Sequence, residues 1–119
     1  MHYRQILGKE SVKFVIIEEG RIVGFANTAQ SWDSDLNTET TGQIVGMYLL
    51  QECWRQGMGR ALMEHSLEHL RGQGFSAAVV WVLESNDRAR GFYEKMGFAT
   101  DGVTKVVQSN GFDLHEVRY

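Results

Sequence analysis

Apolar residues along the chain fall into short runs that polar turns separate, which predicts a mixture of strands and helices. The runs at 12–17 and 22–29 flank a polar turn containing Gly20, a pattern typical of a β-hairpin. A third run at 43–50 has Gly46 in its middle, as at a β-bulge. We therefore expect three strands in the first half of the chain.

The second half combines helical and strand patterns. Apolar residues recur at helical spacing within 57–74, and the continuous apolar run at 77–83 is typical of a strand buried on both faces. A second helix is expected over 88–96, with Asn86 or Asp87 as its N-cap.

Two end segments complete the pattern. The alternating tail contains the Asn110–Gly111 pair, which is a strong signal for a hairpin turn. Residues 2–8 are expected to form one or two helical turns. The predicted order is β-β-β-α-β-α-β-β, an α+β or mixed α/β layer architecture.

Composition narrows the class of protein. A length of 119 residues fits a single domain over 1–119, and 43% hydrophobic with 23% charged residues is ordinary for a soluble globular protein. Cys53 is the only cysteine, which excludes a disulfide framework and a cysteine-rich zinc site. No apolar run approaches the ~20 residues of a membrane helix, and the start lacks the apolar core of a signal peptide, so we expect a cytoplasmic protein without a membrane partner. The net charge of −3 argues against a nucleic-acid partner.

The segment between the apolar run at 43–50 and the first helix is the richest in chemistry. Gly57 and Gly59 permit tight backbone angles, and the first N–H groups of a helix lack internal partners and attract anions. Arg55 and Arg60 would add charged donors, so the turn suits a phosphate or pyrophosphate. The alternative is that the two glycines only let the chain turn tightly.

Two known phosphate-binding patterns fit this segment less well. The P-loop string GxxxxGK(S/T) does not occur in the sequence. The dinucleotide pattern GxGxxG has Leu62 in place of its third glycine, and 119 residues are too few for a full Rossmann domain.

A second group of residues follows the strand expected at 77–83. Asn86 lies at the end of that strand, and Phe92 and Tyr93 follow on the second helix, ahead of Phe98. The two phenylalanines are interpreted as core residues. Tyr93 is either an amphipathic core residue or a proton donor to a leaving group, since a phenol can serve as both.

Together these segments resemble the GCN5-related N-acetyltransferase (GNAT) family over roughly 12–119. The string WRQGMG at 54–59 is similar to the family's loop signature, Arg or Gln, two residues, Gly, one residue, then Gly or Ala. NDRARGFYEKMGF at 86–98 is similar to the later family pattern N..A..FYE..GF. The resemblance implies a central, mostly antiparallel sheet in which two parallel strands, at 43–50 and 77–83, splay apart.

The resemblance implies acetyl-CoA as co-substrate and no metal. The pantetheine arm would lie between the splayed strands, held by backbone groups of Leu49 and Leu50 and by Asn86. The Leu49 N–H would face the developing oxyanion, and Tyr93 would protonate the departing thiolate. The pyrophosphate would be bound by Arg55, Gln56, Gly57, Met58, Gly59, Arg60 and Ala61.

Two positions depart from the family pattern. Trp54 stands at the first place of the loop signature, where it would pack under the loop. Gln43 stands where some family members have a glutamate base, and a glutamine cannot take up a proton at neutral pH. Glu84 is then the first candidate for the base, with a solvated turn carboxylate or a water relay as the alternatives.

The start of the chain departs further, because family members usually begin with a strand and two helices before the hairpin. About ten residues precede the hairpin here, and they are interpreted as the tail of the second of those helices. We therefore expect a shortened N-terminus that lacks the usual first strand and first helices, as a natural short form, a misassigned start or a fragment. The apolar surface left uncovered would favour a homodimer.

Several residues have an ordinary interpretation. His65 and His69 stand four residues apart on the first helix without a third ligand, so a surface or half-buried pair is favoured over a metal site. Cys53 is interpreted as a small semi-buried residue, because direct acetyl transfer needs no covalent intermediate on the enzyme.

The polar loop at 30–41 leaves two choices open. Its acidic residues Asp33, Asp35 and Glu39 are either solvated or attract a cationic acceptor. Trp32 either lines an acceptor pocket or pins the loop to the core.

The leading functional hypothesis is an acetyl-CoA-dependent N-acetyltransferase, an enzyme that acts on the primary amine of a small molecule or peptide. The alternative is a non-catalytic acyl-CoA-binding or regulatory module, motivated by Gln43 and the shortened start. A nucleotide-binding module that uses the glycine turn is the third hypothesis.

Overall fold

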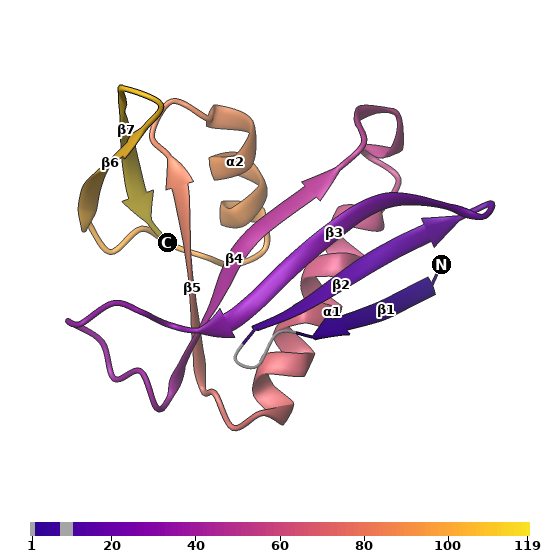
Figure 1. Ribbon diagram of the computed structural model, residues 1–119, viewed down its shortest axis with the longest axis horizontal. Helices are drawn as coiled ribbons and strands as arrows, with labels where there is room; N and C mark the ends of the chain where they lie inside the picture. Colours follow the sequence, from indigo (N-terminus) through magenta and orange to yellow (C-terminus); the bar gives the residue numbers. More distant parts are fainter. Residues whose placement is uncertain (1, 8–10) are drawn as a thin grey trace. The chain divides into compact units, whose positions relative to one another are not determined.

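Four consecutive antiparallel strands form the sheet of the first part of the molecule. The computed structural model describes residues 2–7 and 11–119, and the chain forms two compact units, 1–79 and 80–119 (Figure 1). In the first unit the strands pair in chain order, each antiparallel to the next: β1 (His2–Leu7), β2 (Ser11–Glu18), β3 (Arg21–Gln30) and β4 (Thr41–Leu49).

The first strand corrects the prediction for the start of the chain. Residues 2–7 form a strand, whereas helical turns were expected over 2–8, and the expected lack of a strand ahead of the hairpin is also wrong. β1 pairs with β2 from His2 opposite Ile17 to Leu7 opposite Val12. A helix this short is unstable alone, whereas the edge of a neighbouring strand supplies partners for the backbone.

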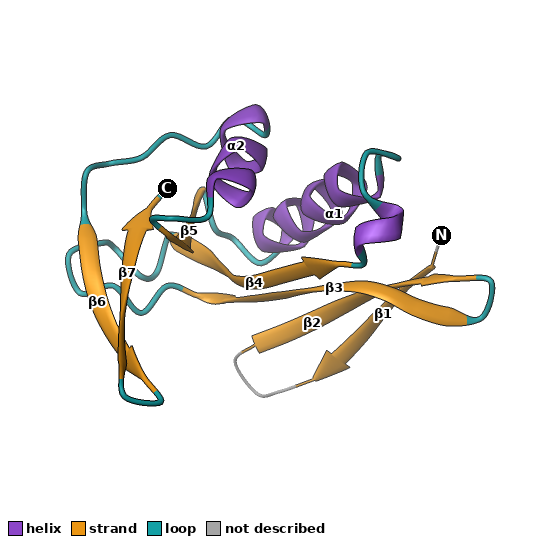
Figure 2. Cartoon of the chain, turned by 90° about the horizontal axis from the view of Figure 1, so that it is seen from above, coloured by secondary structure: helices purple, strands orange, loops and turns teal. Residues whose placement is uncertain are grey.

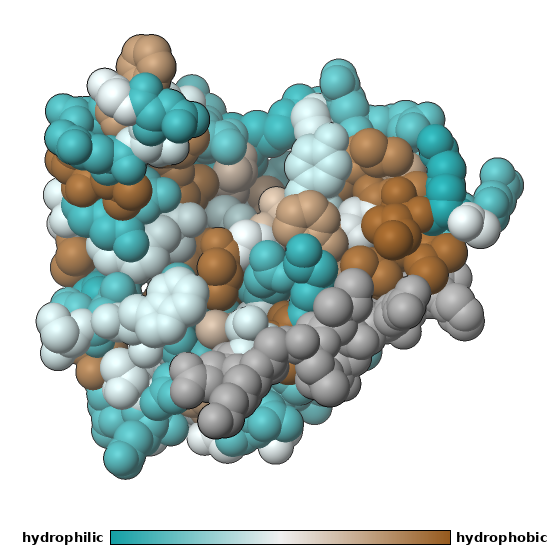
Figure 3. Space-filling view, in the orientation of Figure 1, coloured by the Kyte–Doolittle hydropathy of each residue, from teal (hydrophilic) through white to brown (hydrophobic). Residues whose placement is uncertain are grey.

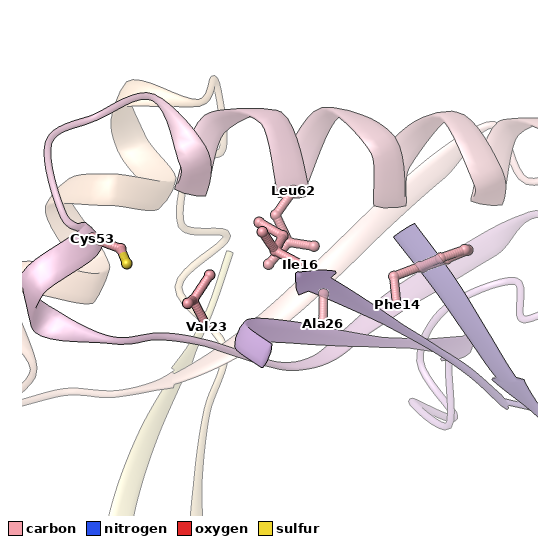
Figure 4. Packing of buried hydrophobic residues seen from close by; sticks show 6 residues of the cluster. All are labelled: Phe14, Ile16, Val23, Ala26, Cys53 and Leu62. Carbon is pink, nitrogen blue, oxygen red and sulfur yellow. The ribbon is translucent and has the colours of Figure 1, made fainter. Parts of the chain in front are cut away.

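Helix α1 (Met58–Gly72) covers one face of this sheet (Figure 2). Leu62 of α1 packs against Ile16 of β2 and Ala26 of β3, and all three side chains are buried (Figure 4). Phe14, Val23 and Cys53 complete this core cluster. Cys53 was expected to be semi-buried, but its side chain is 6% exposed, so it is a fully buried core residue with a free thiol.

Strand β4 contains the expected irregularity. Its register with β3 shifts between Gly46, which lies opposite Asn27, and Ile44, which lies opposite Thr28. Val45 is therefore the extra residue of a bulge, one position before the glycine that signalled it.

The second unit contains the closing hairpin. The strand β5 (Ala77–Leu83) runs across the boundary between the units, and α2 (Asp87–Lys95) follows it. β6 (Thr104–Ser109) and β7 (Phe112–Arg118) form an antiparallel hairpin, and β7 also pairs antiparallel with β5. Asn110 and Gly111 have φ values of 52° and 82°, as a type I′ turn requires, so the hairpin prediction is confirmed.

The α+β class with mostly antiparallel pairing is confirmed, with one more strand at the start than predicted. The single domain over 1–119 and the splay between the strands at 43–50 and 77–83 stay predictions. Neither of the two α-helices in the described chain is long and apolar enough to cross a membrane.

Candidate active site

The link from β4 to α1 is a short, tightly wound segment. A 3₁₀ turn, η1 (Gln51–Cys53), begins after a gap of one residue beyond the end of β4, and Arg55 and Gly57 then adopt positive φ values of 64° and 81°. The indole N–H of Trp54 donates to the carbonyl of Leu49 at 2.9 Å. This hydrogen bond holds the segment between β4 and α1 against the end of β4.

The start of α1 leaves backbone donors without internal partners. The Ala61 N–H donates to the Gly57 carbonyl at 3.0 Å, and this is the first bond of the helix, so the N–H groups of Met58, Gly59 and Arg60 precede the ladder. Within the described chain, no side chain caps α1 and its first turn has no acidic residue. This end of the helix therefore suits an anionic ligand.

The predicted pyrophosphate residues differ in what they can offer. Ala61 cannot supply a free amide, because its N–H is already used inside the helix. The Gln56 side chain donates to the carbonyl of Glu52 at 3.0 Å, so the side-chain amide is used within the loop. Arg60 is exposed and lies 3.7 Å from Glu64, and Arg55 is also exposed.

The end of β4 separates the two leucines. The Leu50 N–H donates to the Val23 carbonyl of β3 at 2.9 Å, and the Leu50 carbonyl accepts from Cys53. Alternate residues of an antiparallel strand direct their N–H groups to opposite edges, so the Leu49 N–H points to the edge of β4 away from β3. The Leu50 N–H is therefore already used within the sheet, and the ligand roles of the Leu49 and Leu50 backbone groups stay predictions.

Gly24 lets β3 approach this part of β4 closely. It lies opposite Leu49, and a Cβ atom at position 24 would be 2.8 Å from the carbonyl oxygen of Tyr48. Real Cβ atoms do not come this close to backbone oxygens, so a side chain here would push β4 aside.

Gln43 is buried in β4 with an unsatisfied acceptor. Its side chain is 5% exposed, and its Oε1 has no hydrogen-bond partner among the described residues. A buried carbonyl oxygen without a donor is costly. Gln43 therefore occupies the place where a glutamate base was considered, but its amide cannot act as a base.

Tyr93 lies on α2 in the second unit. Its side chain is 7% exposed, with its ring edge-on to Phe92 and Phe98 at 5.6 and 6.0 Å between centroids. Burial raises the pKa of the Tyr93 phenol above its ordinary value of 10.0. The phenol therefore stays protonated at neutral pH, as a proton donor must.

Asn86 and Glu84 lie just before α2. The Asn86 side-chain oxygen accepts from the Ala89 N–H at 3.1 Å, which makes Asn86 the N-cap of α2 and confirms the first of the two caps expected. Its side-chain NH₂ group is not used in the cap and could donate to a ligand. The Glu84 side chain is exposed, and its backbone carbonyl accepts from Arg90 at 3.0 Å.

The polar loop at 30–41 lies far from the end of β4. Ser31, next to Trp32, donates to Thr41 at the start of β4, whereas Leu49 lies seven residues beyond Gly42. At ~3.3 Å per residue this separates the loop from Leu49 by about 23 Å. Trp32 is 66% exposed, so it does not pin the loop by burial, and the distance gives it no place beside the Leu49 N–H.

The histidine pair on α1 packs against β2. His65 and His69 are half-buried, and their rings lie edge-on to Phe14 at centroid distances of 4.6 and 4.9 Å. The half-buried interpretation is therefore confirmed. The described residues include no group of three side chains that could hold a metal ion.

One polar cluster of the second unit has no signal in the sequence. Arg90 and Glu94 of α2 both bond to the hydroxyl of Tyr119. The four-residue spacing of Arg90 and Glu94 signals that they are neighbours on a helix, but no spacing links them to Tyr119.

Comparisons with known proteins address the family. The model of the acetyltransferase (GNAT) family matches residues 2–98. The uncharacterized N-acetyltransferase YuaI of Bacillus subtilis is 35% identical over 92 residues, which cover 72% of this chain and 52% of that protein. An uncharacterized N-acetyltransferase of Archaeoglobus fulgidus is 30% identical over 93 residues, covering 77% of this chain and 63% of the other. The chain thus spans between half and two thirds of the length of these curated relatives.

A solved structure supports the fold. The aminoglycoside N-acetyltransferase AAC(6′)-Iy, in complex with CoA, superimposes with a TM-score of 0.76 at 12% identity, over 87% of this chain and 78% of that one. At this identity the likeness concerns the fold alone. From the family match over most of its length, together with its strand order and the loop after β4, the chain belongs to the GNAT acetyltransferase family.

Proposed function

We propose that this chain binds acetyl-CoA and transfers its acetyl group to a primary amine. The observation that carries the proposal is the start of α1, where a left-handed Gly57 leads into a helix whose first amides have no partner inside the helix. Family membership gives that anion site its ligand class. The acceptor would be the amine of a small molecule or a peptide.

The first unit would bind the co-substrate. Backbone amides from Gln56 to Arg60 would hold the pyrophosphate, with the guanidinium groups of Arg55 and Arg60 as charged donors. The Leu49 N–H would bind the carbonyl oxygen of the acetyl group as it becomes an oxyanion. One such donor contributes about 3 kcal/mol to the transition state in measured enzymes.

The second unit would supply the proton donor. The amine nitrogen attacks the thioester carbonyl carbon, the C–S bond breaks, and the departing thiolate takes the phenolic proton of Tyr93. The amine loses its proton to Glu84 or through water to solvent. The Asn86 amide NH₂ would contact the pantetheine arm, since its oxygen is already used in capping α2.

The second candidate is a non-catalytic acyl-CoA-binding module. Gln43 favours the binding module, because some family members have a glutamate that acts as general base at this position. Here the position holds a buried glutamine with an unsatisfied oxygen. Such a module would bind acetyl-CoA and acetylate no amine.

A thermal-shift titration with acetyl-CoA, CoA, NAD and ATP tests the ligand. At 100 times its Kd a ligand stabilises the native state by about 2.7 kcal/mol, which for a domain of this size is on the order of ten degrees. A shift with acetyl-CoA and CoA alone supports the proposal, and a shift only with NAD or ATP contradicts it. Thiol release across a panel of amines then separates the transferase from the binding module.

A homodimer in the cytoplasm completes the proposal. Large hydrophobic side chains are exposed in both units, including Ile22 on β3 and Phe112 at 71% exposure on β7. Figure 3 shows hydrophobic atoms exposed beside the turn that joins β2 and β3. Burying such surface would drive association. A concentration series in light scattering tests the dimer, and cell fractionation tests the location.

A further inference from the structure

A polar network ties α2 to the end of β7. Tyr119 follows β7 with its side chain 4% exposed, and its backbone N–H and C=O pair with Val80 of β5 at 2.9 and 3.1 Å. The Tyr119 hydroxyl donates to Glu94 Oε2 at 2.6 Å and accepts from Arg90 Nε at 3.0 Å. Arg90 Nη1 donates to the Glu84 carbonyl at 3.0 Å. One hydroxyl therefore joins a cation and an anion of α2 to the sheet.

The charges of this network make its bonds strong. Hydrogen bonds with one ionised partner are shorter and stronger than neutral ones, and the Tyr119 hydroxyl has such a partner on each side. Arg90 and Glu94 stand one helical turn apart, so the hydroxyl contacts two successive turns of α2. Two contacts along a helix restrain both its rotation and its sliding.

Helix α2 is short, so it depends on tertiary contacts such as this network. It has nine residues, and Tyr93 is its only buried one. A helix this short is unstable without tertiary contacts. Tyr93 and Glu94 are adjacent, so a rotation that moves the Glu94 carboxylate away from Tyr119 also moves the Tyr93 ring.

Small displacements of Tyr93 matter for the chemistry proposed above. A proton donor must come within hydrogen-bond reach of the atom that it protonates, and a misplacement of about 1 Å can cost about 100-fold in rate. Packing against Phe92 and Phe98 holds the ring, but both belong to α2 or to the segment that follows it. The contact to Tyr119 reaches instead to β7, the far end of the second unit's chain.

We propose that Tyr119 is a positioning residue, which holds α2 through Arg90 and Glu94 so that the Tyr93 phenol stays where it protonates the leaving thiolate. The catalytic half of this inference rests on the function proposed for Tyr93. The structural half, that Tyr119 holds α2, does not depend on that function.

Hydrogen exchange tests the structural half without any turnover. In Tyr119→Phe, which keeps the ring and removes the hydroxyl, we expect the α2 amides to exchange about tenfold faster while the amides of β2 and β3 keep their wild-type rates. Tyr48→Phe, at an exposed position of β4, is the matched control and should leave α2 unchanged. Glu94→Gln keeps an acceptor for the hydroxyl and should retain most of the protection that Glu94→Ala loses. Wild-type exchange of α2 in Tyr119→Phe would overturn the proposal.

A double-mutant cycle tests the catalytic half, with an amine that the wild-type chain acetylates. Tyr119→Phe should lower kcat about tenfold and change the KM for acetyl-CoA less than about twofold. In a Tyr93→Phe background the same change should lower kcat less than about twofold, because the phenol to be positioned is gone. An equal loss in both backgrounds would overturn the link to Tyr93. A wild-type chain without an acetyl-CoA thermal shift contradicts the proposed function instead, and hydrogen exchange then decides alone whether Tyr119 holds α2.

Discussion

The two α-helices of the described chain begin in opposite ways. At the start of α1, Gly57 is in the left-handed conformation, and in the described chain no side chain caps the helix and no acid occupies its first turn. At the start of α2, Asn86 caps the Ala89 N–H and Asp87 stands in the first turn. Both helices follow a strand, but α1 is reached through a 3₁₀ turn and a left-handed glycine, whereas α2 is reached through three polar residues that end in its cap.

This difference separates a helix end that the chain itself caps from one whose backbone donors are open to an external anion. An N-cap and a first-turn carboxylate satisfy the donors and the dipole of α2 from within the chain. At α1 the same donors and the same dipole remain for a ligand. Variants at the start of α1 should therefore change binding, whereas variants of α2 should change turnover or stability.

Gly57→Glu should have the largest effect, because it places a negative charge at the open start of α1. A like charge beside a bound anion costs several kcal/mol, so we expect acetyl-CoA to bind about 100-fold more weakly or worse. The φ value of 81° adds backbone strain for any residue with a side chain. Isothermal titration with acetyl-CoA measures the loss.

Gly57→Asn is the control for that strain. Asparagine tolerates the left-handed conformation and carries no charge, so its acetyl-CoA affinity should stay within about fivefold of wild type. Wild-type affinity in Gly57→Glu would show that the start of α1 is not the phosphate site.

Tyr93→Phe should have the second largest effect. Because Tyr93 lies on α2, it should change turnover and not the binding of acetyl-CoA. Loss of the proton donor should lower kcat at least about tenfold, whereas the acetyl-CoA Kd should stay within about twofold. Steady-state kinetics and a binding titration on the same preparation separate the two effects. Unchanged turnover would remove Tyr93 from the mechanism.

The pH dependence of turnover should show in which protonation state Tyr93 acts. The phenol acts in its protonated form, and burial raises its pKa above 10.0. The rate that depends on Tyr93 should therefore persist at pH 10 and fall as pH rises through the raised pKa. In Tyr93→Phe this alkaline limb should disappear from the profile of kcat.

The parts of this site that sequence predicts are those that depend on neighbours along the chain. The turn at Asn110–Gly111 and the cap at Asn86 follow from one or two residues whose backbone preferences are strong. Gly46 of β4 likewise predicted the position of the bulge to within one residue, since the extra residue is Val45. Each of these signals is local, and the structure confirms it.

The remaining parts depend on tertiary pairing. Residues 2–7, HYRQIL, form a strand because they pair with β2. The six residues themselves carry no signal that β2 lies beside them. Leu49 and Leu50 differ only in strand parity, which the Leu50 bond to Val23 reveals. The Tyr119 network joins residues 25 and 29 positions apart, beyond any periodicity of the sequence.

Asn86→Ala should have a moderate effect on stability, apart from the loss of the NH₂ group that would contact the pantetheine arm, and this loss of stability sharpens the contrast between the helices. Removing an N-cap costs about 1 kcal/mol, because the Ala89 N–H loses its partner. Urea unfolding should show this loss. Gly57→Ala removes no cap hydrogen bond from α1, so any loss there reflects strain alone. Equal m-values in the two variants would show that both unfold from comparable native states, whereas unchanged stability of Asn86→Ala would mean that its cap adds nothing.

His69→Gln should have the smallest effect, and it concerns the other end of α1. His69 stands in the last turn, where the helix dipole favours a cation, yet burial and then the nearby His65 lower the pKa of His69 below its ordinary 6.5. Above pH 6.5 the imidazole is neutral in both the folded and the unfolded chain. As pH falls below 6.5, the unfolded chain binds the proton first, so the free energy of unfolding should decrease until the lower folded pKa is reached. Urea unfolding at pH 7.5 and 5.5 should show a smaller decrease for His69→Gln than for wild type, whereas His115→Gln, at an exposed position of β7, should keep the wild-type decrease. A wild-type decrease in His69→Gln would mean that, at this end of α1, the dipole offsets the cost of burying the charge.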